Sequence, residues 1–142
     1  MGNKKAAPGA VLMILTAAAA LAALVLYIQN CKTNYFMNLG TDKSIVVCLA
    51  VCAGAEILMV ILSAVLGAKP YLDILPVIAG VCAATATVRF IGSRIAGAAS
   101  IMTFENNAEN MADLNAAIVA MAVCAAAMFC VMISSFFKAV KD

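Results

Sequence analysis

The chain has 142 residues, of which 66% are hydrophobic and 11% charged, and its mean hydropathy is +1.08. A soluble globular domain is only about half apolar, so this composition excludes that class and indicates a membrane protein. The formal net charge is +2, and no loop holds a cluster of Lys and Arg, which argues against nucleic acid as a partner.

Four apolar runs are each close to the ~20 residues that a bilayer-spanning helix needs. They cover about residues 9–28, 44–67, 72–93 with an extension to 102, and 112–136. The sequence therefore predicts an all-α fold, with one domain over residues 1–142 that forms an integral membrane four-helix bundle. The outer loops are short, and we expect both to be too short for a folded ectodomain.

The first run follows Lys4 and Lys5 and resembles the start of a signal peptide. No small-residue cleavage site is evident near residues 27–31, so we expect the run to be retained as the first span. Lys and Arg gather on the cytoplasmic side of membrane proteins. With the N-terminus inside, that side holds Lys4, Lys5, Lys69, Lys138 and Lys141, against Lys32, Lys43 and Arg94 outside. Among the acids, Asp42, Glu105, Glu109 and Asp113 face out, whereas Asp73 and Asp142 face in. We therefore predict a multi-pass protein of the cell membrane with both termini cytoplasmic.

The second run contains a single acidic residue, Glu56, about a dozen residues from its outer end. At ~1.5 Å of rise per residue, this places the carboxyl group well inside the hydrocarbon. An isolated charge there costs about 2.5 to 3.5 kcal/mol, so Glu56 must be protonated, hydrated or paired. Cys48, Cys52 and Ser63 share one helical stripe with Glu56, and we expect that stripe to face protein.

The candidate counter-charge for Glu56 is Arg89 in the third run. Folding the second and third runs as a hairpin places Arg89 about 10 Å closer to the outer face than Glu56. A direct pair and a bridge through water, Thr85 or Thr87 are both open. The pair would form a structural clasp or a transport site. The further alternative is that Glu56 or Arg89 pairs with a charge on another subunit. We expect Arg94, farther along, to extend its charge to the membrane interface.

The outer loops combine amides with aromatic rings, a chemistry that suits sugars and other neutral polar ligands. Asn is also a common turn and cap residue, so a structural role is the alternative. The candidate contacts of such a ligand are Asn34, Tyr35, Phe36, Phe104 and Asn107.

Small residues recur every four positions in the last three runs, a pattern that lets membrane helices approach closely. The rows include Ala79/Ala83, Gly92/Ala96/Ser100 and Ala116/Ala120/Cys124, and Ala53 with Gly54 opens another. Packing within the bundle explains such rows, and contact with a second copy or with another membrane protein is the alternative.

The chain contains no His, which removes the usual general base and the commonest metal ligand. No CxxC, HExxH, GxSxG or P-loop pattern occurs, and five of the six Cys residues lie in apolar runs, where they read as packing residues. We therefore expect no enzymatic activity, no metal and no cofactor.

The segments KTNYFMNLGTDKS, KPYLDILP and IMTFENNAENMADLN together resemble small four-span membrane proteins of gut Firmicutes that have no assigned activity. The resemblance implies an accessory membrane component near carbohydrate uptake, and it implies no particular functional residues.

These observations lead to one expected function and one alternative. We expect a non-enzymatic membrane protein that acts through assembly, as a homo-oligomer or as a small accessory subunit of a larger membrane complex. The alternative is a small oligomeric channel or transporter for an ion or small polar solute that uses Glu56 and Arg89.

Overall fold

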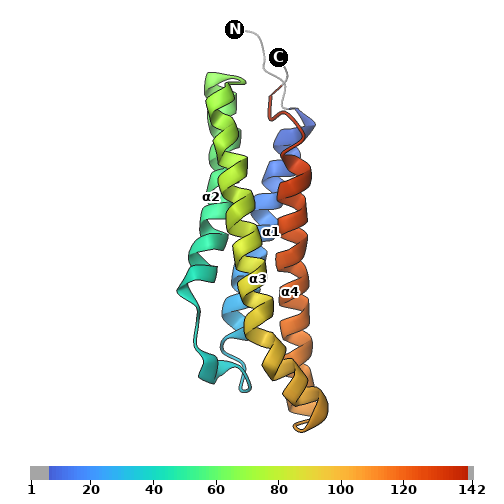
Figure 1. The fold of residues 1–142 in the computed structure, drawn as a ribbon. Coiled ribbons are helices and arrows are strands. Elements are labelled where there is room, and N and C mark those ends of the chain that lie inside the picture. The colour runs from blue at the N-terminus through green and yellow to red at the C-terminus, as the bar shows by residue number, and fades with distance from the viewer. Residues whose placement is uncertain (1–6, 141–142) are drawn as a thin grey trace.

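In the computed structural model, which describes residues 7–140, four long helices dominate the chain (Figure 1). They are α1 (Pro8–Asn30), α2 (Lys43–Leu66), α3 (Ile74–Thr103) and α4 (Ala108–Ser134). The 3-10 turns η1 (Met37–Leu39) and η2 (Pro70–Asp73) precede α2 and α3. Each of the four long helices is long and apolar enough to cross a membrane, so the protein is a multi-pass membrane protein. The predicted spans are confirmed within a few residues, although α4 begins at Ala108 rather than at residue 112.

The helices form a ring in which α1 and α3 lie diagonally and each packs against both α2 and α4. Figure 1 shows both chain ends and the α2–α3 turn at one end of the bundle, which we call the terminal end. The α1–α2 connection and the α3–α4 turn lie at the other end, which we call the loop end. Lys4, Lys5, Lys141 and Asp142, which contribute to the predicted orientation, lie outside the described residues.

The interior of the bundle is built mainly from small side chains. Helix association in lipid depends on close backbone approach rather than on the hydrophobic effect, which explains why alanine lines the helix contacts. Ala20, Ala23, Ala79, Ala86, Ala117, Ala120 and Ala127 are all fully buried. Many large apolar side chains point outward, with Val65 and Val88 each 70% exposed, whereas a smaller number such as Leu49 and Phe90 are fully buried. The row Ala79/Ala83 is confirmed as packing inside the bundle, whereas Gly92 and Ala96 face outward.

The loop end carries a small packed cap, formed by the α1–α2 connection and the ends of α3 and α4. Helix α3 has 30 residues, so at ~1.5 Å per residue it spans about 45 Å and exceeds the ~30 Å hydrocarbon layer. The α1–α2 connection folds against this extra length, where Phe36, Ile101, Leu114 and Ala117 form a buried cluster. Gly97 is required there, because a Cβ atom would lie 2.9 Å from the Phe36 ring.

At the terminal end, residues 135–140 fold back over the bundle as a C-terminal strap. The Ala7 N–H donates to the Ala139 carbonyl at 3.4 Å. Ala139 and Val140 are buried in a cluster with Met13 and Met59, beside Leu72. The strap therefore covers the space between the helix ends.

We expect Gly9→Val to release the C-terminal strap. A Cβ atom at Gly9 would collide with the Lys138 carbonyl group and lie 2.9 Å from the Phe137 carbonyl oxygen, and backbone cannot move aside as a side chain can. The expected loss is about 2 kcal/mol of unfolding free energy, with faster proteolysis after residue 134.

Gly92→Ala is the matched control for Gly9→Val. A Cβ atom at Gly92 meets nothing within 4 Å, so the alanine should stabilise the helix by about 0.5 to 1 kcal/mol. Equal stability of Gly9→Val and the parent protein, with an unchanged cleavage pattern, would contradict the packed strap.

Candidate functional site

Arg89 forms an ion pair at the start of α2 rather than with Glu56. Its Nε and Nη2 atoms donate to Asp42 Oδ2 at 3.0 and 2.8 Å, and the Arg89 side chain is 52% exposed. The other Asp42 oxygen accepts the Ser44 N–H at 2.9 Å and caps α2. Asp42 precedes Glu56 by about 20 Å of helix rise, beyond the reach of any arginine side chain held at Asp42. The predicted Glu56–Arg89 clasp is therefore wrong.

The Asp42–Arg89 pair makes the stability of the fold depend on acid pH. The Arg89 guanidinium holds the pKa of the Asp42 carboxyl below its usual value of 3.8. A carboxyl with a lowered folded-state pKa contributes stability above pH ~4, and the contribution is lost as pH falls through the folded-state pKa. Because the pair is exposed, we expect Asp42→Asn to cost under about 1 kcal/mol at pH 7 and progressively less as pH falls below ~4. Urea unfolding in detergent at several pH values measures this, and a cost that persists at low pH would refute it.

Arg94 is buried, although the sequence favoured a position at the interface for its charge. Its side chain is 2% exposed, and Nε donates to Asn30 Oδ1 at 2.8 Å. Nη2 donates to Cys31 Sγ at 3.3 Å, and Nη1 donates to Ser93 Oγ at 3.2 Å. Among residues 7–140, no carboxylate lies within ion-pair distance of this guanidinium. The buried charge therefore depends on neutral partners.

Three aromatic rings complete the surroundings of Arg94. Its Cζ atom lies 4.8 Å from the ring centre of Phe36, 5.3 Å from Phe90 and 5.8 Å from Tyr27. Ring faces attract cations, and the attraction is strongest where water is excluded. Phe90 precedes Arg94 by four residues on α3, and this i, i+4 spacing was the one signal in the sequence. The rings from α1 and the α1–α2 connection depend on the tertiary fold.

The predicted outer-rim residues hold the cap together rather than converge on a pocket. Asn34 donates to Glu109, and the Tyr35 N–H donates to Asp113 at 3.0 Å. The Tyr35 hydroxyl donates to Glu105, and Asn107 caps α4 by accepting the Asn110 N–H. Phe36 lies against Arg94, whereas Phe104 is 90% exposed and contributes to neither group of contacts. These contacts anchor the α1–α2 connection to the loop end of α3 and α4.

Apart from Nδ2 of Asn30, the buried side-chain nitrogen and oxygen atoms without a hydrogen-bond partner in the described part of the chain belong to Glu56. It is 1% exposed, and neither carboxyl oxygen has a hydrogen-bond partner among the described residues. The predicted bridging residues do not reach it, because Thr85 is exposed and Thr87 donates to the Ala83 carbonyl at 2.8 Å. The cluster of buried residues at this level is apolar: Ala17, Ala20, Cys52, Ala53, Ala55, Ala79, Ala83 and Val131. Buried polar groups are nearly always bonded, so the isolation of this carboxyl requires an explanation.

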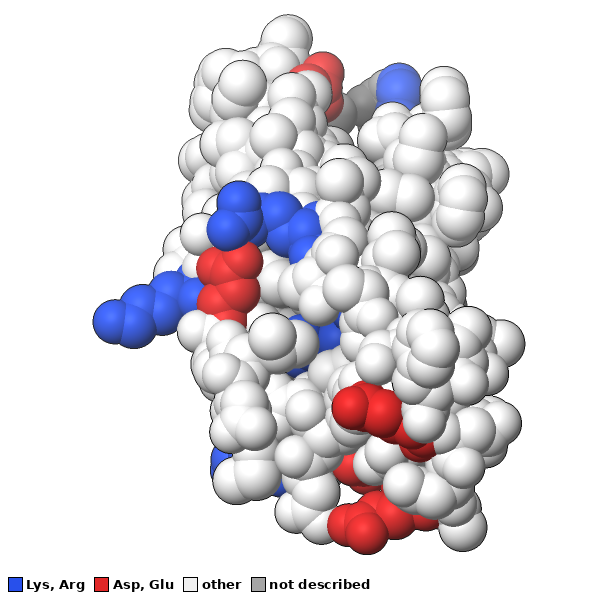
Figure 2. Space-filling view, turned by 60° about the horizontal axis from the view of Figure 1, so that its bottom comes forward, with Lys and Arg blue, Asp and Glu red and all other residues white. Residues whose placement is uncertain are grey.

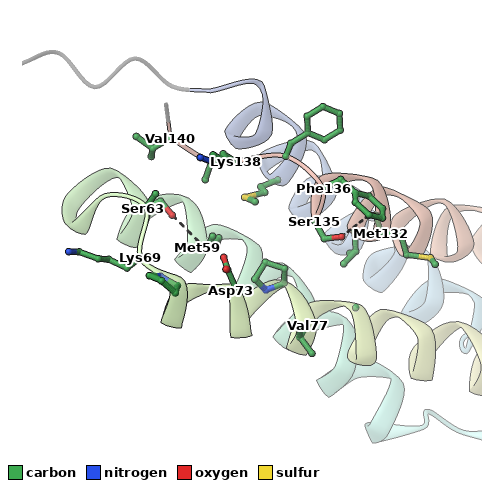
Figure 3. A pocket seen from close by; sticks show the side chains of 18 residues that line it. Met59, Ser63, Lys69, Asp73, Val77, Met132, Ser135, Phe136, Lys138 and Val140 are labelled. Atoms are coloured by element: carbon green, nitrogen blue, oxygen red, sulfur yellow. Dashed lines mark hydrogen bonds between the residues drawn. The ribbon is translucent and has the colours of Figure 1, made fainter. Parts of the chain in front are cut away.

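A cavity of about 640 Å³ opens at the terminal end of the bundle, beneath the C-terminal strap (Figure 3). Met59 and Ser63 line it from α2, and they lie one and two helical turns from Glu56 on the same buried stripe. Gly80 and Val131 line it from α3 and α4. Figure 3 shows the Asp73 carboxylate and the Ser63 hydroxyl directed into this space, whereas Lys69 points away from it. Glu56 and this cavity form the candidate functional site.

Comparison of the chain with protein-family models, with curated proteins and with solved structures finds no match. The resemblance to small four-span proteins of gut Firmicutes therefore stays a prediction.

Proposed function

We propose that this protein acts through assembly in the membrane, as a homo-oligomer or as a small subunit of a larger membrane complex, and has no enzymatic role. The observation that carries this proposal is Gly54, in the middle of α2. Gly54 is exposed on the face opposite the buried stripe, and a Cβ atom there meets nothing within 4 Å. Glycine within a helix costs about 0.5 to 1 kcal/mol relative to alanine, and no contact inside the bundle compensates for it.

Close approach of a helix from outside the bundle gives Gly54 a role. Ala50, one turn earlier, is also exposed, so the two form a small-xxx-small pair on the outward face of α2. Such pairs let two membrane helices bring their backbones together. The larger outward side chains on either side, Val47 and Ile61, then flank the contact.

We expect Gly54→Leu to weaken self-association at least about tenfold, because a large side chain separates the two backbones. The dissociation constant is measured in lipid nanodiscs or bicelles by fluorescence energy transfer between labelled copies. Ala126→Leu, on an exposed position of the diagonally opposite α4, is the matched control and should leave association unchanged.

Two results decide between the forms of assembly. A parent protein that stays monomeric at high protein-to-lipid ratio removes the homo-oligomer. A partner chain that copurifies with Ala126→Leu but is lost with Gly54→Leu supports the accessory subunit. Equal effects of both substitutions would contradict a specific role of the α2 face.

We further propose that both termini face the cytoplasm. Glu105, Glu109 and Asp113 lie in the cap at the loop end, where Figure 2 displays a group of acidic side chains, whereas Asp73 lies at the terminal end. In the sequence, Lys4, Lys5, Lys69, Lys138 and Lys141 belong to the terminal side, against Lys32, Lys43 and Arg94 on the loop side. Basic residues mark the cytoplasmic side. Reporter fusions to the C-terminus test this: green fluorescence with no alkaline phosphatase activity is expected, and the reverse pattern refutes it.

A second candidate function is transport of an ion or small polar solute. The observation that favours it is the unpartnered carboxyl of Glu56, because ionisable groups inside the membrane commonly mark transport pathways. Arg89 is no longer part of this candidate, since it bonds Asp42. Glu56→Gln should abolish flux into liposomes while assembly persists, and a parent protein without measurable flux removes the candidate.

A further inference from the structure

The isolation of Glu56 restricts the state of its carboxyl group. A charge that is buried in an apolar medium without a partner is costly enough that the group takes up a proton or gains water. The titratable side chains nearest to Glu56 along the bundle are the thiols of Cys52 on α2, Cys82 on α3 and Cys124 on α4. On α1, the buried residues at the same height are Thr16, Ala17 and Ala20. No described Lys or Arg side chain pairs with Glu56 from any of the other helices.

The same surroundings do not suit a metal cation. Hard cations require several oxygen ligands arranged around them. The nearest hydroxyl groups already donate within their own helices, Thr16 to the Leu12 carbonyl and Thr87 to the Ala83 carbonyl, each at 2.8 Å. No group of three or more His, Cys, Asp or Glu side chains that could hold a metal ion occurs among residues 7–140. The ligand that a lone carboxyl among alanines can bind is a proton.

The cavity at the terminal end supplies a route for that proton. Its lining reaches Met59, which is three residues and about 4.5 Å of helix rise from Glu56. Its polar groups include the Ser63 hydroxyl and the Asp73 carboxylate, both directed inward (Figure 3). A volume of about 640 Å³ with such groups can hold ordered water, which needs room and two to four polar partners. The cavity therefore ends one helical turn from Glu56, which does not itself line it, and Met59 lies between the two.

The opposite side of Glu56 is closed by packing. Leu49, two turns toward the loop end, is fully buried in a cluster with Tyr27 and Phe90. Ala86, Ala120 and Cys124 complete this layer from α3 and α4, each at most 1% exposed. The cavity thus approaches Glu56 from the terminal end, whereas tight packing closes the loop-end side.

We propose that Glu56 is a proton-binding site that exchanges its proton with the aqueous phase at the terminal end, through the cavity lined by Met59, Ser63, Asp73 and Gly80. Exchange is reversible binding of one proton by the carboxylate and needs no other reactant. The proposal goes beyond assembly and adds a ligand and a route to the transport candidate. Its test does not depend on flux, so failure of transport and failure of this site are distinguishable.

Infrared difference spectroscopy of the full chain in nanodiscs tests the site. We expect a carboxylic acid C=O band that titrates with pH and is missing in Glu56→Gln. In D₂O, the band should shift in the parent protein, and Gly80→Leu should slow that shift at least about tenfold by filling the cavity. Gly80→Ala keeps the fold secure, because its Cβ atom would meet Val131 Cγ1 at an ordinary 3.7 Å, and should slow exchange less.

Val88→Leu, at an outward position of α3 where the side chain is 70% exposed, is the control and should exchange like the parent protein. The absence of a Glu56-dependent acid band at every pH from 4 to 9 overturns the proton site. Equal exchange rates in Gly80→Leu, Gly80→Ala and the parent overturn the route through the cavity. A titration that shifts by about one pH unit when sodium replaces choline identifies a metal cation site instead, and this also overturns the proposal.

Discussion

Replacing Arg94 with alanine should destabilise the protein by about 4 kcal/mol. The substitution leaves Asn30 Oδ1 buried without its donor and removes a large side chain from between the rings of Phe36, Phe90 and Tyr27. It also removes one link between the α1–α2 connection and α3, because Cys31 loses its contact with the guanidinium. Arg94→Lys should recover little, since an ammonium group lacks the planar fork that donates to Asn30, Cys31 and Ser93 together.

Arg89→Ala is the matched control for Arg94→Ala, five residues earlier on the same helix. Its side chain is 52% exposed and its one ion pair joins Asp42 at the surface, so the expected loss is below about 1 kcal/mol. Both losses are measured by reversible unfolding in mixed micelles. Equal losses for the two arginines, or a fully stable Arg94→Lys, would contradict the buried aromatic cage.

Glu56→Leu should stabilise the bundle by about 2 kcal/mol, the opposite of what a Glu56–Arg89 clasp would require. The carboxyl has no hydrogen-bond partner to lose, and a leucine of similar size suits the surrounding alanines. Glu56→Gln should fall between the two, because an amide is uncharged but still polar.

Met59→Leu, a volume-conserving change one turn away on the same stripe, controls for general repacking and should change stability by less than about 1.5 kcal/mol. Unfolding in mixed micelles at pH 7 gives all three values. A loss of stability in Glu56→Leu would show that the carboxyl has a partner and would remove the case for a solitary site. A stabilised variant that loses the acid band would instead show a residue kept for a purpose other than folding.

The membrane class and the four spans could be read from the sequence because they depend on local composition. A run of about twenty apolar residues suits a bilayer wherever it lies in a chain. The inward face of α2 was equally local, since Cys52, Glu56 and Ser63 share one helical stripe and all three are buried. The sequence likewise marked Glu56 as the residue that most needs an explanation.

The partners of the charged residues were decided only by the tertiary structure. Arg89 and Arg94 are five positions apart, which is about 140° around a helix, so they must face in different directions. Nothing local determines which of the two faces the bundle. The position of each arginine along α3 determines its neighbours. Arg89 lies level with Asp42 at the start of α2 and pairs with it, whereas Arg94 lies beyond that level and contacts the Phe36 ring of the cap. Helical spacing fixes where side chains lie around one helix, whereas the register between helices fixes what they meet, and for this protein that register leaves Glu56 alone.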